Sequence, residues 1–234
     1  SFLTEANIMN LMRQGSMIAI LAVGETFVII TTGIDLSVGA VVGFCTVIAA
    51  WLLTHDFSIF ATVVITLGVG VAIGMFHGFG IVQMGLPPFI ITLATLTSLR
   101  GIGLLITNGA TINIVNDTFT EFSRNDFIGL PNLFWMVLLV GIPAYIFLHH
   151  SRYGRYIFAV GSNMEAARLS GVNVKLTVYL AYTLSCACAA FVGLLLAARI
   201  GVGNAMQADG WARQALAPSV IGGPSLFGAA GSVH

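Results

Sequence analysis

The sequence predicts an all-α protein that crosses a membrane several times, and three observations lead to this prediction. Of its 234 residues, 57% are hydrophobic and only 8% are charged, whereas roughly a quarter of the residues in a soluble domain carry charge. Several runs without Asp, Glu, Lys or Arg are long enough for a membrane-spanning helix, which takes about 20 apolar residues. Apolar and polar residues do not alternate within these runs, and this argues against a transmembrane β-barrel.

About six membrane-spanning helices are expected, in the order in which the apolar runs follow one another. They cover residues 15–32, 36–53, 59–83, 86–106, 132–150 and 176–200. A shorter apolar run at 214–230, rich in Gly and containing Pro218 and Pro224, predicts a partial or re-entrant segment. We expect one transmembrane domain over residues 1–234, truncated at both ends, because the chain opens without Met and closes without a charged tail.

The loop at residues 151–175 is the most basic part of the sequence, with four of the nine basic residues and a single acid. Its basic residues are Arg152, Arg155, Arg168 and Lys175. Short loops rich in Lys and Arg stay in the cytoplasm, so this loop is expected inside the cell. Residues 107–131 hold three acids and one Arg. That loop and residues 1–14 are then expected on the outer side.

Glycines at four-residue spacing predict close helix packing. Gly70, Gly74 and Gly78 follow this spacing in one predicted span, and Gly39 and Gly43 follow it in another. Small residues repeated in this way let the backbones of two membrane helices approach each other. We therefore expect a neighbouring segment to lie directly against each of these faces.

Two charged residues fall inside predicted spans. Glu25 lies in the first span and Arg100 in the fourth, and burying either one unpaired costs at least a few kcal/mol. Each is expected to face a partner, a water-filled path or an interface, and both a structural ion pair and a role in the pathway remain open. Thr92 and Thr95 share one helical face with Ser98, where hydroxyl groups more often bond between helices than bind a solute.

The stretch "TTGIDLSVGAVVG" interrupts two apolar runs with polar residues and glycines. An ionisable residue close to the membrane is a functional candidate, and Asp35 is the one in this stretch. Asp35 with Ser37 can also cap the following helix by accepting its free amides. We favour the cap over direct contact with a substrate.

The sequence holds no motif for nucleotide binding or catalysis. Lys175 is the only lysine and follows "GVNV", so this chain supplies no phosphate-binding P-loop, and any ATP must be bound by a partner. Paired carboxylates, a serine elbow and metal-ligand histidine spacing are also missing, so no catalytic or metal site is predicted. The three cysteines lie in apolar spans and are interpreted as small hydrophobic residues.

Within the basic loop, "EAARLSG" predicts a short helix from residue 165 to residue 171. Ser162 or Asn163 can cap its start, and Gly171 can end it in a left-handed turn. A plain connecting loop needs no such helix. The residues alone leave two interpretations open, a helix on which a partner docks and an amphipathic helix at the membrane interface.

Three motifs in order resemble one known family. The stretches "TTGIDLSVGAVVG", "RYGRYIFAVGSNMEAARLSGVNV" and "VIGGPSLFGAAGSV" are similar to those of the permease subunit of bacterial ribose-type sugar importers of the ATP-binding cassette class. The resemblance runs along nearly the whole chain. Permeases for branched-chain amino acids form a neighbouring branch, but "GIDLSVG" fits the sugar branch better. The segment "WARQALAPSVIGG" departs from the acidic run that the family usually has there.

The resemblance implies a function and a set of partners. Glu165, Ala166, Ala167, Arg168 and Gly171 would form the coupling helix that docks on the ATPase subunit. The chain would lie in the bacterial inner membrane, pair with a second permease subunit as a homo- or heterodimer, and receive ribose, xylose, galactose or a similar sugar from a periplasmic binding protein. It would bind no cofactor and no nucleic acid. The alternative is an ion-coupled secondary carrier of a small polar solute.

The residues proposed for the pathway are the polar ones within the spans. These candidates, for a pathway or a structural role, are Glu25, Asp35, Ser37, Thr92, Thr95 and Arg100.

Overall fold

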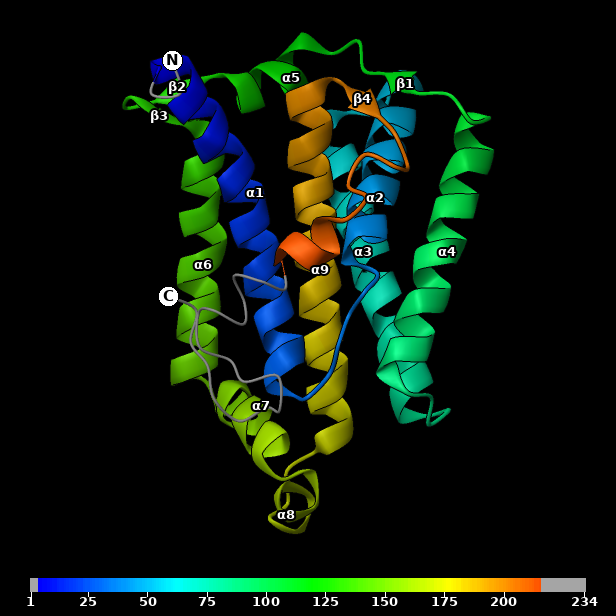
Figure 1. The fold of residues 1–234 in the computed structure, drawn as a ribbon, viewed down its shortest axis with the longest axis vertical. Coiled ribbons are helices and arrows are strands. Elements are labelled where there is room, and N and C mark those ends of the chain that lie inside the picture. Colours follow the sequence, from blue (N-terminus) through cyan, green and yellow to red (C-terminus); the bar gives the residue numbers. More distant parts are fainter. Residues whose placement is uncertain (1–3, 216–234) are drawn as a thin grey trace.

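The computed structural model describes residues 4–215 of the chain, which form a bundle of long helices (Figure 1). The helices are α1 (Glu5–Ile30), α2 (Val38–Thr54), α3 (Ile59–Val82), α4 (Pro88–Thr107), α5 (Asp117–Arg124), α6 (Asn132–His150), α7 (Arg152–Ser162), α8 (Met164–Leu169) and α9 (Val174–Ile200). The short strands are β1 (Ile112–Asn113), β2 (Asp126–Phe127), β3 (Leu130–Pro131) and β4 (Val202–Gly203). Strand β1 pairs antiparallel with β4, and β2 with β3.

The predicted multi-pass architecture is confirmed. Helices α1, α3, α4, α6 and α9 are long and apolar enough to cross a membrane, and α2 is a shorter apolar helix. The first helix begins at Glu5, ten residues before the predicted start, because its polar first turns continue the helix beyond the apolar run. The predicted partial segment at 214–230 lies almost wholly outside the described residues.

The two ends of the bundle carry different segments, as the charge pattern predicts. The start of α1, α5 and all four strands lie at one end, and α7 and α8 lie at the other (Figure 1). The acidic loop and the N-terminal segment are therefore on the same side of the bundle, opposite the basic loop.

Helix α9 is the centre of the bundle and packs against α1, α2 and α3. The predicted glycine face on α3 is confirmed as its contact with α9: a Cβ atom added at Gly74 would lie 2.5 Å from the Cα of Thr183. By contrast, a Cβ at Gly68 on the same helix would meet nothing within 4 Å. The α3 glycines thus bring two backbones together, as small residues do in membrane bundles.

The glycines of α2 make a second close contact. A Cβ added at Gly39 would lie 2.8 Å from the carbonyl oxygen of Ala208, and one at Gly43 would overlap Ala205. The segment after β4 therefore crosses directly over the first turns of α2, at the position where the functional site is described below.

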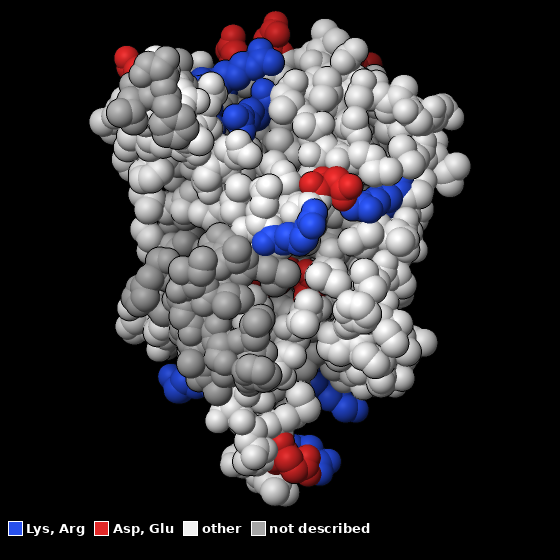
Figure 2. Space-filling view, viewed as in Figure 1, with Lys and Arg blue, Asp and Glu red and all other residues white. Residues whose placement is uncertain are grey.

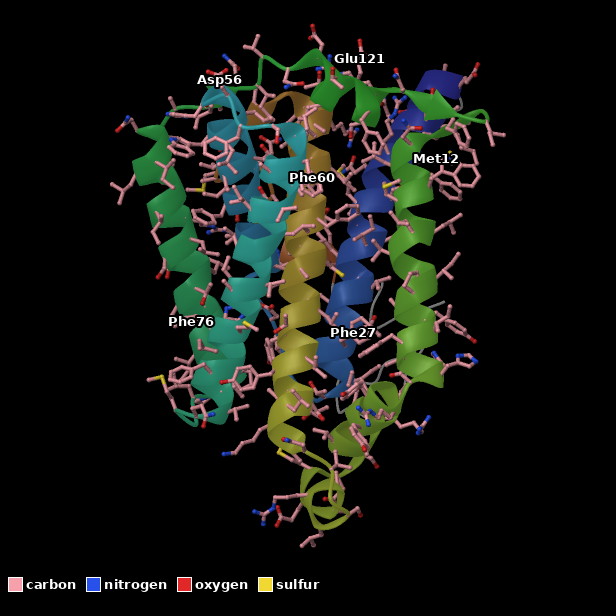
Figure 3. The ribbon with its side chains drawn as sticks, turned by 180° about the vertical axis from the view of Figure 1, so that it is seen from behind. Met12, Phe27, Asp56, Phe60, Phe76 and Glu121 are labelled. Atoms are coloured by element: carbon pink, nitrogen blue, oxygen red, sulfur yellow. The ribbon has the colours of Figure 1, made fainter. Side chains whose placement is uncertain are left out.

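The outer faces of the bundle are apolar. Phe60 and Phe76 of α3, labelled in Figure 3, are 79% and 56% exposed. In the same view Asp56 and Glu121 lie at one end of the bundle. This distribution suits a protein whose sides contact lipid and whose ends contact water.

Helix α2 begins at Val38, two residues after the start of the predicted span over 36–53. Its 17 residues cover about 26 Å at 1.5 Å per residue, less than the ~30 Å hydrocarbon core. Residues 31–37 are non-helical and run from the end of α1 back into the bundle (Figure 1). Such irregular backbone is tolerated at membrane depth where protein surrounds it, and Gly33, Asp35 and Ser37 are buried.

Candidate functional site

The predicted short helix in the basic loop is present as α8. The side chain of Asn163 accepts a hydrogen bond from the backbone N–H of Ala166 at 2.9 Å, so Asn163 rather than Ser162 is its cap. Gly171 follows with a φ of +83°, the left-handed turn that glycine adopts most readily. The sequence prediction missed α7, an amphipathic helix that leads into α8 from α6.

Helix α8 presents both polar and apolar groups to its surroundings. Ala167 is buried and holds the helix against the protein, whereas Met164 is 47% and Leu169 80% exposed. Arg168 donates to Glu165 at 2.5 Å, and about two thirds of each side chain is exposed. An exposed ion pair of this kind contributes little to stability, so both groups are available to a partner.

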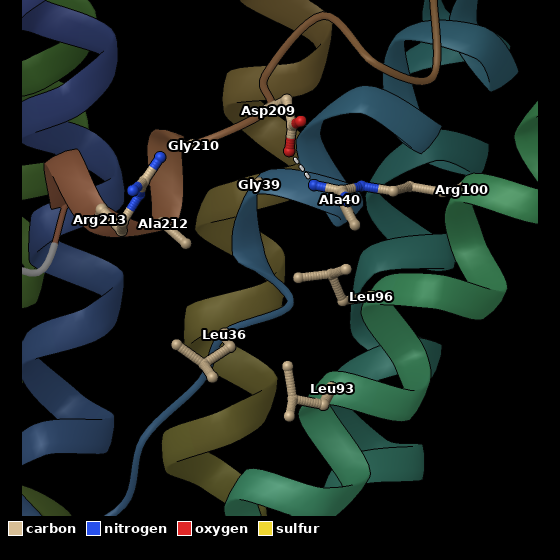
Figure 4. Close-up of a pocket in the computed structure, with 10 residues that line it drawn as sticks. All are labelled: Leu36, Gly39, Ala40, Leu93, Leu96, Arg100, Asp209, Gly210, Ala212 and Arg213. Carbon is tan, nitrogen blue, oxygen red and sulfur yellow. Dashed lines mark hydrogen bonds and ion pairs between the residues drawn. The ribbon is translucent and has the colours of Figure 1, made fainter.

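A cavity of about 250 Å³ lies between the start of α2, the middle of α4 and the segment after β4 (Figure 4). It is lined by Leu36, Gly39, Ala40, Leu93, Leu96, Arg100, Asp209, Gly210, Ala212 and Arg213. It is smaller than the ~300–1,000 Å³ pockets that hold drug-sized ligands. Leucines form its apolar part and three charged side chains form its polar rim, a lining that suits a small polar solute.

Arg100 and Asp209 form an ion pair at the edge of this cavity (Figure 4). Their side chains are 28% and 58% exposed. Charged atoms on the face drawn in Figure 2 lie mainly at the two ends and in one group at mid-height. Sequence reasoning found Arg100 and missed Asp209, because Asp209 follows the last predicted span in a segment with no apolar period.

Glu25 is not the partner of Arg100. Its side chain is fully buried, and among the described residues neither of its carboxylate oxygens has a hydrogen-bond partner. Of the two embedded charges, only Arg100 forms an ion pair within residues 4–215.

Asp35 is buried and accepts two hydrogen bonds through Oδ1, from the backbone N–H of Ser37 at 2.9 Å and from its hydroxyl at 2.6 Å. The predicted cap is thus half correct. Asp35 accepts one amide at the start of α2, but Ser37, which occupies the N-cap position, accepts no helix amide. Its hydroxyl donates to Oδ1 of Asp35.

The two predicted threonines of α4 behave differently. Thr95 bonds across to α3, where its Oγ1 lies 2.9 Å from Nε2 of His77. Thr92 donates to the carbonyl oxygen of Pro88 in its own helix, and Ser98 is exposed. Thr95 therefore confirms the predicted bond between helices, and Thr92 does not make one.

With this architecture the chain is a multi-pass membrane protein, and its sequence places it in a transport class. Residues 7–233 match the sequence model of the family described as the permease component of the branched-chain amino acid transport system. The match covers nearly the whole chain, so the protein belongs to this family of transport permeases.

Curated relatives within this class are similar over the full chain. The ribose import permease protein RbsC of Escherichia coli (strain K12) is 35% identical over 100% of this chain and 74% of its own length. The D-allose transport system permease protein AlsC of the same organism is 34% identical over 99% and 72%. The xylose transport system permease protein XylH of Haemophilus influenzae is 30% identical over 100% and 79%. No solved structure was found to match.

Proposed function

We propose that the chain is the membrane-spanning subunit of an ATP-binding cassette importer that carries a sugar across the bacterial inner membrane. Relatives named for ribose, allose and xylose transport support a sugar as the solute. They favour this function over an ion-coupled secondary carrier. The structural observation that carries the proposal is α8, a capped helix that projects from the cytoplasmic end with exposed polar and apolar groups.

The partner at α8 is an ATPase subunit. Leu169 is 80% exposed, and an exposed apolar side chain beside an exposed ion pair suits a protein contact. Glu165 and Arg168 supply charge-assisted bonds to that partner. ATP binds to the partner and not to this chain.

Motion at α8 has a direct route into the bundle. A turn at Gly171 separates α8 from α9, whose start is capped by Asn173. Because α9 packs against α1, α2 and α3, a displacement of α8 shifts the central helix against the three that surround it. ATP drives transport if it binds one state of the complex more tightly than the other.

The solute path lies along the face that carries Arg100, Asp209 and Arg213. Charged groups facing lipid near mid-membrane cost several kcal/mol, so this face is covered by a second permease subunit or by water. The cavity beside Arg100 offers a sugar both hydrogen-bonding groups and apolar contact. A periplasmic binding protein delivers the solute to this path from the side that carries α5.

Site-specific photo-crosslinking tests this function. A photoreactive amino acid at position 168, in the complete complex in its native membrane, is expected to form an adduct with the ATPase subunit whose yield changes with ATP. The matched control is position 121 on α5, which is also exposed but lies at the opposite end of the bundle (Figure 3), where no such adduct is expected. If a folded complex gives no ATPase adduct at position 168, the proposal is wrong.

A further inference from the structure

Three buried side chains with metal-binding atoms converge in the membrane part of the bundle. They are Asp35 in the non-helical segment before α2, His77 on α3 and Cys186 on α9. The Nδ1 of His77 lies 3.6 Å from the Sγ of Cys186 and 3.9 Å from the Oδ2 of Asp35. The same Sγ lies 3.7 Å from the same Oδ2, and all three residues are completely buried.

These separations fit a tetrahedral zinc site. Bonds of about 2.3 Å to sulfur and about 2.0–2.1 Å to nitrogen and oxygen place neighbouring ligand atoms ~3.3–3.6 Å apart. The two distances to sulfur, 3.6 and 3.7 Å, are close to the upper value, and the 3.9 Å between Nδ1 and Oδ2 is wider by about half an ångström. Small side-chain movements would bring all three atoms onto one ion. The fourth position is left for water or for the hydroxyl of Ser185, 3.4 Å from Oδ2 of Asp35.

Neighbouring groups already orient two of the three ligands. The hydroxyl of Thr95 donates to the carbonyl oxygen of Ile91 at 2.9 Å, so it accepts from the N–H at Nε2 of His77. The Nδ1 of His77 then presents its lone pair to Asp35 and Cys186. Ser37 occupies Oδ1 of Asp35 and leaves Oδ2 for the cluster. Such outer hydrogen bonds are typical of metal sites, where they fix the ligand orientation.

The buried acidic groups around the cluster favour a bound cation. Asp35 and Glu25 are both fully buried, and within residues 4–215 neither forms an ion pair with a Lys or Arg. Both carboxylate oxygens of Glu25 also lack hydrogen-bond partners in that part of the chain. Two carboxylates without a basic partner in the membrane interior are costly, and a divalent ion on the cluster offsets that cost.

We propose that Asp35, His77 and Cys186 bind a zinc ion that ties the segment before α2 to α3 and α9. The mixture of sulfur, imidazole and carboxylate ligands suits zinc and not magnesium or calcium, which take oxygen ligands only. The bound ion would fix the start of α2, which supplies Leu36, Gly39 and Ala40 to the cavity wall. This inference rests on the cluster alone and is independent of the transported solute.

Metal content measures the site directly. The intact complex, purified into lipid nanodiscs and dialysed against a zinc buffer, is expected to retain about one zinc ion per permease chain. Cys186→Ser and His77→Asn should each lose most of this zinc. Cys188→Ser is the matched control, two residues further along the same helix and outside the cluster, and it should retain the zinc. Wild-type protein without zinc, or zinc retained equally by all variants, would overturn the proposal.

Cobalt(II) binding provides a second readout, which does not depend on whether the variants of the cluster residues fold. In the double variant Cys45→Ser/Cys188→Ser, Cys186 is the one cysteine that remains of the three in this sequence. Cobalt bound there should give a near-ultraviolet thiolate charge-transfer band and strong visible bands of a tetrahedral site. If the cluster instead holds only a proton on His77 paired with Asp35, neither set of bands arises, and the zinc site is refuted.

Discussion

Arg100 of α4 forms an ion pair with Asp209, which lies 109 positions later in the chain. The pair connects the middle of a membrane-spanning helix to the segment that crosses α2 after β4, and it forms one edge of the cavity. It therefore has a structural role and also borders the proposed solute path, the two roles that the sequence left open for Arg100.

Reversing one charge of this pair should damage the protein, and reversing both should repair it. Arg100→Asp and Asp209→Arg each place two like charges at the cavity edge, at an expected cost of about 1–3 kcal/mol in the free energy of unfolding. The double variant restores attraction and should recover much of the stability. Thermal unfolding in nanodiscs measures the three variants. Additive losses in the double variant would show that the two side chains do not interact.

An added methyl group at Gly74 should disrupt the contact between α3 and α9. In Gly74→Ala the new Cβ would lie 2.5 Å from the backbone of Thr183, so one helix must move, at about 1–3 kcal/mol for such overpacking. Gly68→Ala is the control on the same helix, where the new Cβ meets nothing. It should be neutral or slightly stabilising, because alanine favours helix over glycine. Equal midpoints of thermal unfolding for the two variants would contradict the packing described.

The cap of α8 should control how well that helix is formed. Asn163→Ala removes the acceptor for the amide of Ala166 and is expected to cost about 1 kcal/mol, which raises the local opening equilibrium about fivefold. Hydrogen–deuterium exchange of peptides covering residues 164–169 measures this opening. Asn163→Asp keeps an acceptor and should exchange like the wild type. Unchanged exchange in Asn163→Ala would mean that the cap does not stabilise α8.

A charge at Leu169 should weaken docking of the ATPase subunit without unfolding the permease. Leu169 is 80% exposed, so Leu169→Asp loses no internal packing but places a carboxylate in the proposed contact, where desolvation disfavours it. Co-purification of the ATPase subunit should fall at least several-fold. Val115→Asp, at a 94% exposed position on the opposite side, should leave co-purification unchanged. The same ATPase yield from both variants would contradict docking at α8.

Much of this fold could be predicted from the order of residues, for identifiable reasons. A bilayer demands about 20 apolar residues per helix, so the long spans are visible as composition alone. Local signals also identified α8, because Asn163 and Gly171 act on backbone groups a few residues away. The polar residues at 31–37 marked the break before α2, but the burial of this segment inside the bundle was not predictable, because it depends on contacts with helices distant in the chain.

Contacts between distant segments account for what the sequence did not predict. Asp209 meets Arg100 only because the segment after β4 turns back across α2. Asp35, His77 and Cys186 stand 42 and 109 positions apart along the chain, so no motif spacing marks them as a cluster. The proximity of His77 and Cys186 depends on the glycine contact between α3 and α9. Because no local signal marks this contact, the sequence alone favours the interpretation of Cys186 as a small hydrophobic residue.

Sugar uptake by the complete reconstituted complex tests the central claim most directly. Proteoliposomes containing the permease, its ATPase subunit and its binding protein would be supplied with radiolabelled ribose, allose or xylose, with and without ATP on the cytoplasmic side. We expect uptake of at least one sugar that requires both ATP and the binding protein and is reduced several-fold in the Leu169→Asp variant. Uptake driven by a proton or sodium gradient in the absence of ATP would contradict it.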